Sequence, residues 1–118
     1  MQRLKRLTVA VLLLLMAAVS FYAGRQTAPA MSLKLDNARV SVTESLMPSG
    51  GRREPYTRET DQILVFLDEA QYESIDAAGK VILRQRKVGE IVWHSKGEPA
   101  PLLVNKGKAY RNLIIALK

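Results

Sequence analysis

The sequence predicts an all-β domain carried behind one N-terminal apolar segment. The first 30 of the 118 residues combine a basic start with a long uncharged apolar run. From residue 38 onward, short apolar or alternating runs are separated by Gly, Pro, Asn and Asp, which is the spacing of an antiparallel sandwich or barrel. This part shows no convincing amphipathic helix. We therefore divide the chain into a leader at residues 1–30 and one folded domain at residues 31–118.

The leader is suited to the interior of a lipid bilayer. Residues 1–6 contain three basic side chains and no acid, and residues 7–24 form an uncharged run of 18 residues. About 20 apolar residues span the hydrocarbon core, so this run is adequate if Arg6 and Arg25 snorkel or the bilayer thins. The basic flank favours a cytoplasmic N terminus. We predict a transmembrane anchor that places the domain in the periplasm or outside the cell.

A cleaved signal peptide is the alternative interpretation of the same segment. Residues 28–30 read Ala-Pro-Ala, which has the small-x-small form of a cleavage site. Cleavage would release the domain into the same compartment. Both interpretations therefore predict an extracytoplasmic domain, which is membrane-anchored in one case and secreted in the other.

Composition excludes several functional classes. The net charge is +7, but removing the four basic residues of the leader leaves 14 basic against 11 acidic side chains, a balance of +3 without a basic block. A nucleic-acid binder would concentrate basic and stacking side chains on one surface. The chain has no cysteine, so disulfides and cysteine-ligated metals are excluded and stability must come from packing and strand pairing.

The first two predicted strands lie at residues 38–46 and 62–67. In the first, Val40 and Val42 alternate with polar residues, and Pro-Ser-Gly-Gly at 48–51 ends the strand because Pro lacks a donor and Gly permits positive φ. The second is a continuous apolar run, which predicts a central strand buried on both faces. The spacing of Ile63, Val65 and Leu67 assigns that stripe to the core.

Five further strands complete a predicted set of seven. Residues 71–75 and 81–86 flank a hairpin connection at 76–80 that ends near Gly79. A strand at 91–93 precedes a Pro- and Gly-containing loop at 94–101. Strands at 102–104 and 109–117 are expected to pair around the turn at 105–108. Four aromatic residues are assigned to the core or to an interface, namely Phe66, Tyr72, Trp93 and Tyr110.

Two glycine-spaced motifs lie in this strand pattern. Gly50 is followed after five residues by Tyr-Thr-Arg at 56–58 and after three more by Gln62. Gly89 is followed after five residues by Ser-Lys-Gly at 95–97 and after two more by Ala100. In this spacing, over residues 36–117, the chain resembles the cupin superfamily. The resemblance implies a small antiparallel jelly-roll barrel, with Asn105 one position later than the asparagine that ends the second cupin motif.

The departures from the cupin motifs concern the metal site. In metal-binding cupins the two motifs supply three histidines and a glutamate. The matching positions here are Tyr56, Arg58, Gln62 and Ala100. Imidazole and carboxylate donate lone pairs to a metal ion, whereas a guanidinium places a permanent positive charge where the cation would sit. We therefore expect no metal and no other cofactor in this barrel.

The residues that replace the ligands form a candidate binding site. Alternate residues of an extended chain share a face, so Tyr56, Arg58 and Gln62 are expected to point into the barrel, with His94 nearby. A phenol, a guanidinium fork and an amide suit a carboxylate, a phosphate or sugar hydroxyls. These four residues are the predicted ligand-binding set for a small polar or anionic ligand. A filled interior, in which these groups satisfy one another, is the structural alternative.

The sequence contains few combinations of residues that could act in catalysis. His94 is the only histidine, so it could act only as a lone general base oriented by Glu90 or Glu98. Three acids cluster near the first motif (Glu54, Glu59 and Asp61), but arginines interleave with them, and ion pairing accounts for them more simply. We assign no catalytic residue. The predicted function is a small-ligand-binding or sensing module. One alternative is a structural domain of the cell envelope, dimeric through an edge strand. The other is a metal-independent enzyme that uses His94 or Tyr56.

Overall fold

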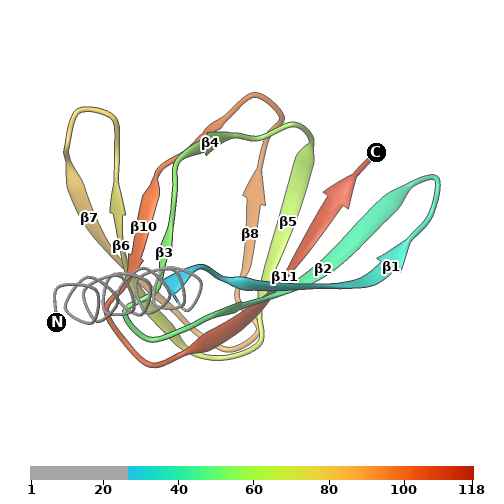
Figure 1. Ribbon diagram of the computed structural model, residues 1–118. Coiled ribbons are helices and arrows are strands. Elements are labelled where there is room, and N and C mark those ends of the chain that lie inside the picture. Colours follow the sequence, from blue (N-terminus) through green and yellow to red (C-terminus); the bar gives the residue numbers. More distant parts are fainter. Residues whose placement is uncertain (1–26) are drawn as a thin grey trace, which may run out of the picture.

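The computed structural model describes residues 27–118, and from residue 30 onward its regular structure consists of strands only (Figure 1). Among the described residues, no helix is long and apolar enough to cross a membrane. The predicted anchor at residues 7–24 lies outside the described residues. The strands are β1 (Ala30–Asp36), β2 (Val40–Met47), β3 (Arg52–Arg53), β4 (Tyr56–Thr57), β5 (Asp61–Phe66), β6 (Ala70–Ile75), β7 (Val81–Arg86), β8 (Ile91–His94), β9 (Pro99–Ala100), β10 (Leu102–Asn105) and β11 (Tyr110–Leu117).

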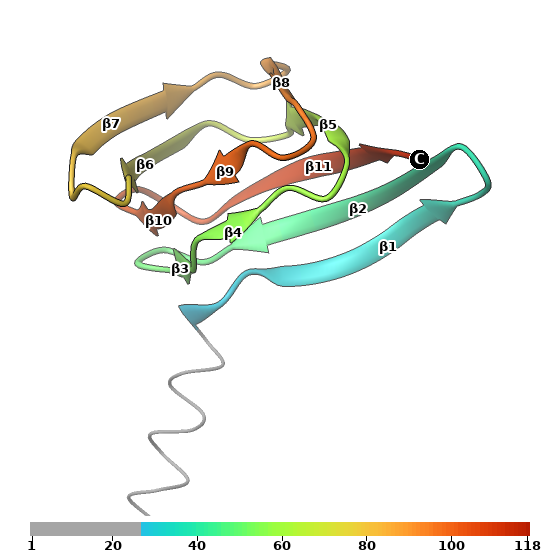
Figure 2. The same cartoon turned by 90° about the horizontal axis from the view of Figure 1, so that it is seen from above.

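The strands form two antiparallel sheets that face each other. The larger sheet has the order β1-β2-β11-β5-β8 and the smaller has the order β3-β10-β6-β7, while β4 and β9 form a separate short pair. Seen from above, this pair lies between the two sheets (Figure 2). β1–β2 and β6–β7 are hairpins, whereas other neighbours, such as β2–β11 and β3–β10, come from distant parts of the sequence, which is the arrangement of a jelly roll. The expectation of an all-β antiparallel barrel is confirmed.

One end of the space between the sheets is filled by an aromatic cluster. Phe66, Tyr72 and Tyr110 come from β5, β6 and β11, and their ring centroids lie 5.9–6.4 Å apart. Met47 and Leu103 complete the buried cluster. Such rings bury large apolar areas, and offset contacts add about 0.5–1.5 kcal/mol per pair. This cluster joins both sheets and is the main core of the domain.

The strand prediction was right in type but incomplete. All seven predicted strands have a counterpart, and the hairpin at 71–86 is confirmed by continuous β6–β7 pairing, with Gly79 at φ +83° in its turn. The prediction missed β1 and the two-residue strands β3, β4 and β9. Two-residue strands carry no periodicity, and their pairing depends on partners that are distant in sequence.

The predicted pairing of residues 102–104 with 109–117 was wrong. β10 pairs with β3 and β6, whereas β11 pairs with β2 and β5. The connection between them therefore passes from one sheet to the other and is not a hairpin. The Asn105 side chain stabilises this connection between the sheets. Its Nδ2 donates to the carbonyls of Pro48 and Lys108, both at 3.0 Å, and its Oδ1 accepts from the Gly107 amide at 3.0 Å.

The assignment of the Ile63, Val65 and Leu67 stripe to the core was also wrong. β5 does lie inside its sheet, between β11 and β8, but only Phe66 among its residues is buried. Phe66 and Leu64 face the interior, so Ile63 and Val65 point to the opposite face. Trp93 pairs directly with Ile63 and is 53% exposed, so it belongs to the outer surface, whereas the other three aromatic residues are core as predicted.

Candidate ligand-binding cavity

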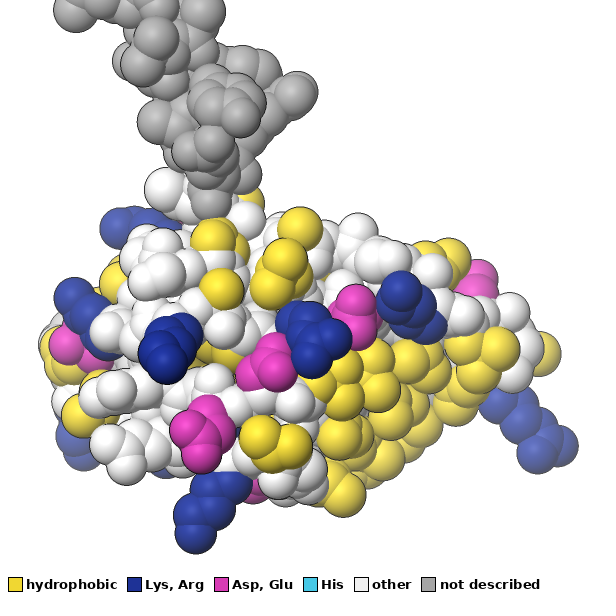
Figure 3. Space-filling view, turned by 90° about the horizontal axis from the view of Figure 1, so that it is seen from below, with side chains coloured by type: hydrophobic (Ala, Val, Ile, Leu, Met, Phe, Trp, Pro, Cys, Tyr) yellow, Lys and Arg dark blue, Asp and Glu magenta, His cyan; other side chains and the backbone are white. Residues whose placement is uncertain are grey.

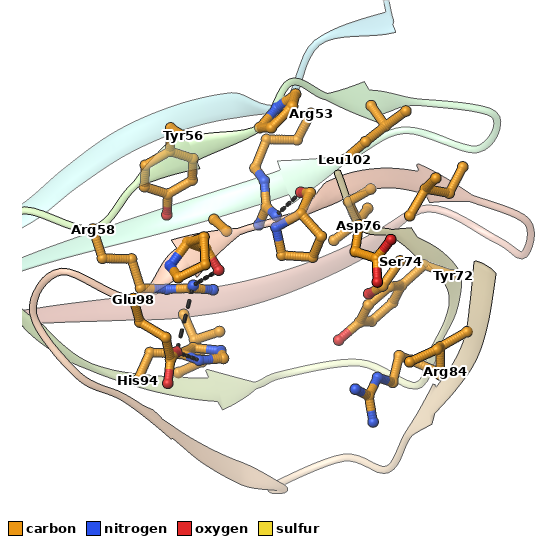
Figure 4. Close-up of a pocket in the computed structure, with 18 of the residues that line it drawn as sticks. Arg53, Tyr56, Arg58, Tyr72, Ser74, Asp76, Arg84, His94, Glu98 and Leu102 are labelled. Atoms are coloured by element: carbon orange, nitrogen blue, oxygen red, sulfur yellow. Dashed lines mark hydrogen bonds and ion pairs between the residues drawn. The ribbon is translucent and has the colours of Figure 1, made fainter. Parts of the chain in front are cut away.

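A cavity of about 1050 Å³ lies between the two sheets, next to the aromatic cluster (Figure 4). Its floor is formed by Phe66, Tyr72 and Tyr110, and further apolar walls come from Leu64 and Leu103. Ligand pockets typically measure 300–1,000 Å³ and are mostly apolar with a few polar groups. The domain therefore encloses enough space for a small organic molecule. Five cationic and two acidic side chains also line it: Arg53, Arg58, Lys80, Arg84, Arg86, Asp76 and Glu98.

Arg58 is held in this wall by its backbone and by its side chain. Its amide donates to the Glu98 carbonyl at 3.1 Å, and its own carbonyl accepts from the Gly97 amide at 2.8 Å. Gly97 has φ +83°, a conformation that favours glycine. The Arg58 side chain is only 4% exposed. Its Nη1 donates to the Pro99 carbonyl at 3.1 Å and lies 3.5 Å from Glu98 Oε2, while its Nε has no partner in the described part of the chain.

Arg53 is a second guanidinium in the same wall, which the sequence analysis did not identify. Its Nη2 donates to the Pro101 carbonyl at 2.6 Å, and its Nε is buried without a hydrogen-bond partner among residues 27–118. Both guanidinium carbons lie over the Tyr56 ring, Arg53 at 5.3 Å and Arg58 at 5.9 Å from its centroid. Burial lowers the pKa of Arg53, and the nearby charge of Arg58 lowers it further. The Tyr56 ring therefore makes two cation–π contacts, one with each arginine.

His94 and Glu98 form the titratable part of the site. His94 Nδ1 lies 2.7 Å from Glu98 Oε2, and the same carboxylate oxygen is the one that Arg58 approaches. Glu98 is therefore the orienting carboxylate that the sequence analysis considered, whereas Glu90 pairs with Arg86 at 2.6 Å. An ionised carboxylate only accepts hydrogen bonds, so Nδ1 carries the hydrogen and Nε2 keeps its lone pair. Burial lowers the pKa of His94 in spite of the bond to Glu98, and the charge of Arg58 contributes to this lowering.

This arrangement predicts the titration of His94. Because it is the only histidine, one imidazole signal reports it in a proton NMR titration of the full-length chain. We expect a pKa below the ordinary 6.5. Glu98→Gln should lower this pKa further because it removes an anionic hydrogen-bond acceptor, and Arg58→Gln should raise it because it removes a neighbouring cation. Glu54→Gln, which changes only a contact with Arg52, is the control. A native pKa above 6.5 would contradict this picture.

The other sequence candidates are distributed unequally around the cavity. Tyr56, Arg58 and His94 line the main cavity, as does Glu98. Gln62 pairs with His94 in register but lines a separate, smaller hollow beside Thr57 and Ala116. The predicted set of four is therefore divided between two spaces, and whether these residues bind a ligand stays a prediction.

The predicted acidic cluster does not form one site. Glu54 pairs with Arg52 at 2.7 Å, and this bond lowers the pKa of Glu54. Asp61 instead accepts the Lys96 amide at 2.8 Å. This ion pair of Glu54 agrees with the pairing to neighbouring arginines that the sequence predicts. Glu54 and Asp61 are therefore engaged by different partners.

The residues of this cavity do not fit the metal that the motif positions imply. No group of three His, Cys, Asp or Glu side chains is arranged to hold a metal ion within residues 27–118. Arg58, at one motif position, instead brings a permanent cation and a donor-only fork into the wall. Asn112 Oδ1 is a third buried polar atom of the lining that lacks a partner in the described structure. The lining therefore combines guanidinium donors with apolar surface.

Comparison with known proteins supports the fold. No protein-family model matches this sequence, and no curated protein does so. A cupin domain from Bordetella pertussis Tohama I has a TM-score of 0.69 at 21% identity, and the match covers 77% of this chain and 94% of that one. The polyketide cyclase RemF from Streptomyces resistomycificus has a TM-score of 0.63 at 19% identity, with coverage of 75% and 64%. The DMSP lyase DddQ from Ruegeria pomeroyi DSS-3 has a TM-score of 0.60 at 16% identity, with coverage of 76% and 47%. The fold is cupin-like.

Proposed function

We propose that this chain is a membrane-tethered, extracytoplasmic binding module whose cupin-like barrel takes up a small organic ligand without a metal. The observation that carries the proposal is the cavity itself: about 1050 Å³ lined by apolar side chains and by arginines with unpartnered Nε atoms. A domain that served only as a scaffold would gain stability by filling such a space, because cavities cost contact energy. An open cavity with polar groups on its wall is the usual form of a ligand site.

Metal-dependent chemistry is not part of this proposal, since a guanidinium occupies one of the motif positions. Two proteins of similar fold bear enzyme names, a polyketide cyclase and a DMSP lyase. A metal-independent reaction here would depend on His94 as the base, and its contact with Glu98 supports that alternative. Other titratable side chains line the cavity, among them Asp76 and Lys80, but of these lining groups only Glu98 is hydrogen-bonded to His94 in the described structure. Binding is therefore the function that this wall supports best.

A cavity-blocking variant tests the proposal. Leu64 faces the cavity and Val65, its neighbour on β5, points outward. We expect a panel of small aromatic and aliphatic alcohols and acids to raise the melting temperature of the full-length chain in mild detergent. Leu64→Trp should abolish these shifts by filling the space, whereas Val65→Trp should retain them. Equal shifts in both variants would place binding elsewhere and contradict the proposal.

A second candidate function, self-association, is supported by the outer face of the larger sheet. Register places Ile63, Val65, Ile91, Trp93, Leu113 and Ile115 on that face, and Ile91 is 68% exposed. Figure 3 shows an apolar area bordered by a row of alternating acidic and basic side chains. Register places Arg111 and Glu44, which pair with Asp68 and Lys34, on the same face of the sheet as Leu113. A membrane surface would favour a basic border. A border of both signs suits a second copy related by a two-fold axis.

Sedimentation of the full-length chain in mild detergent tests this second candidate. We expect a dimer that Ile91→Lys converts to a monomer, because a charge replaces a strongly exposed apolar side chain of the face. Val81→Lys on β7 is the matched control, since Val81 is 54% exposed on the smaller sheet. Sedimentation of the unchanged chain as a monomer would remove this candidate.

A further inference from the structure

A buried guanidinium (Arg58) and a half-buried one (Arg53) meet at one wall of the cavity. Arg53 and Arg58 both lie over the Tyr56 ring, at 5.3 and 5.9 Å, and both leave a buried Nε–H without an acceptor in the described structure (Figure 4). Buried polar groups are nearly always hydrogen-bonded, so two orphaned donors side by side require an explanation. The two Nε atoms have no accessible surface, so a ligand in the cavity would compensate the charge of the two guanidiniums that line its wall and would not bond Nε itself.

The charges at this wall are not balanced. Glu98 is the carboxylate that pairs with Arg58, and it is shared with His94. Within residues 27–118, Arg53 forms no ion pair, and its Nη2 donates to the neutral Pro101 carbonyl. Arg86, on the far side of the cavity, is neutralised by Glu90 and bonded to the Tyr72 hydroxyl. Lys80 and Arg84 also line the cavity, but both side chains are exposed to solvent. The desolvated part of the excess positive charge therefore lies at Arg53 and Arg58, where an added anion is most favourable.

The remainder of the cavity is suited to an apolar ring. Phe66, Tyr72 and Tyr110 present a stacked aromatic floor, and Leu64 and Leu103 add aliphatic walls. Aromatic floors bind flat apolar groups by offset or edge-to-face contact. The cavity thus combines a cationic wall with an aromatic floor, and a ligand that is only anionic, such as inorganic phosphate, would leave the floor uncovered.

We propose that the ligand is a small aromatic carboxylic acid, whose carboxylate accepts hydrogen bonds from Arg53 and Arg58 beside Tyr56 while its ring lies against Phe66, Tyr72 and Tyr110. The planar guanidinium fork matches a carboxylate in shape as well as in charge. This inference rests on the proposed binding function and adds the ligand class and the role of Arg53. It assigns the headgroup to Arg53, at the end of β3, and to Arg58, which directly follows β4.

Three probes that differ only in the headgroup test the inference: 3-phenylpropionate, 3-phenylpropanol and 3-phenylpropylammonium. Binding to the full-length chain in mild detergent is measured by isothermal titration calorimetry, with protein-free detergent as the blank. We expect the acid to bind about tenfold more tightly than the alcohol, as charge-assisted hydrogen bonds predict, and the ammonium to bind more weakly than either. Arg53→Gln and Arg58→Gln should each remove the preference for the acid while the alcohol still binds. Arg39→Gln, at an exposed position between β1 and β2, should leave the preference unchanged.

The outcomes separate this inference from the proposed function. If the alcohol and the acid bind equally well, the carboxylate assignment is wrong and the binding function stands. If the preference for the acid survives in both variants, the two arginines are not the headgroup site. If no probe binds, the proposed function itself fails. Arg53 is only half-buried, so Arg53→Gln provides a folded test even if the fully buried Arg58 does not tolerate replacement, and circular dichroism of each variant establishes that it is folded.

Discussion

Replacing Asn105 with alanine is expected to lower the free energy of unfolding by about 3 kcal/mol or more. The side chain is 1% exposed, and its amide bonds the carbonyls of Pro48 and Lys108 and the Gly107 amide. Each buried group left without a partner costs about 1–3 kcal/mol. No non-glycine residue in the described structure has positive φ, so the loss comes from the side chain and not from backbone strain. Urea unfolding of the full-length chain in mild detergent, followed by circular dichroism, measures it.

Two further variants locate the cause of this loss. Asn105→Asp keeps an acceptor for the Gly107 amide but cannot donate to the two carbonyls, so it should also be strongly destabilising. Lys106→Ala, at the exposed neighbouring position, should change the free energy of unfolding by no more than about 0.5 kcal/mol. An Asn105→Ala variant as stable as Lys106→Ala would show that this crossing between the sheets does not depend on the amide.

Phe66→Ala is expected to cost about 3–5 kcal/mol, the range for deleting a buried ring. Phe66 is 2% exposed and contacts the rings of Tyr72 and Tyr110 as well as the Arg86 guanidinium at 5.7 Å. Its removal would separate the two sheets at their main contact and enlarge the ligand cavity. Urea unfolding of the same preparation gives the free energy.

Val65→Ala is the matched control, because Val65 precedes Phe66 on β5 and points to the outer face. We expect a loss of less than about 1.5 kcal/mol for this smaller and partly exposed side chain. Equal losses for the two variants would mean that the inner and outer faces of β5 have been assigned incorrectly.

The face of β5 that points inward could not be predicted from the sequence. A continuous apolar run identifies a strand inside a sheet but carries no alternation, so the face that points inward is undetermined. Ile63 and Val65 were placed in the core, although Leu64 and Phe66 line it. Register fixes the choice, because Phe66 lies opposite Asn112 and Ile63 lies opposite Trp93. The outer face of β5 is apolar as well. The strand therefore lacks the alternation of polar and apolar residues that would have identified its inner face.

The connection between β10 and β11 shows a second limit. A four-residue turn between two strands predicts a hairpin on local grounds. Here the turn leads from one sheet to the other, since β10 pairs with β6 and β11 pairs with β2. The buried bonds of Asn105 decide this, and a single sequence gives no indication that Pro48, 57 residues away, supplies one of the acceptors. By contrast, the β6–β7 hairpin was predictable because its turn and both strands are local.

The candidate site was also predictable only in part. Motif spacing placed Tyr56, Arg58 and His94 near the barrel interior, and all three line the cavity. Gln62 was displaced to a neighbouring hollow. Arg53 was missed because it was grouped with the arginines expected to form ion pairs with the nearby acids, and its burial arises only when β3 pairs with β10 and brings it against Pro101.

The placement of Trp93 has a practical consequence for spectroscopy. It is the only tryptophan, it is 53% exposed on the outside of the larger sheet, and its indole nitrogen donates to Ser95 Oγ at 3.0 Å. Its emission therefore senses solvent at the outer wall and not the content of the barrel. Occupation of the cavity should leave the emission maximum unchanged, whereas covering the outer face should shift it to shorter wavelength, so one fluorophore distinguishes the two events without any label.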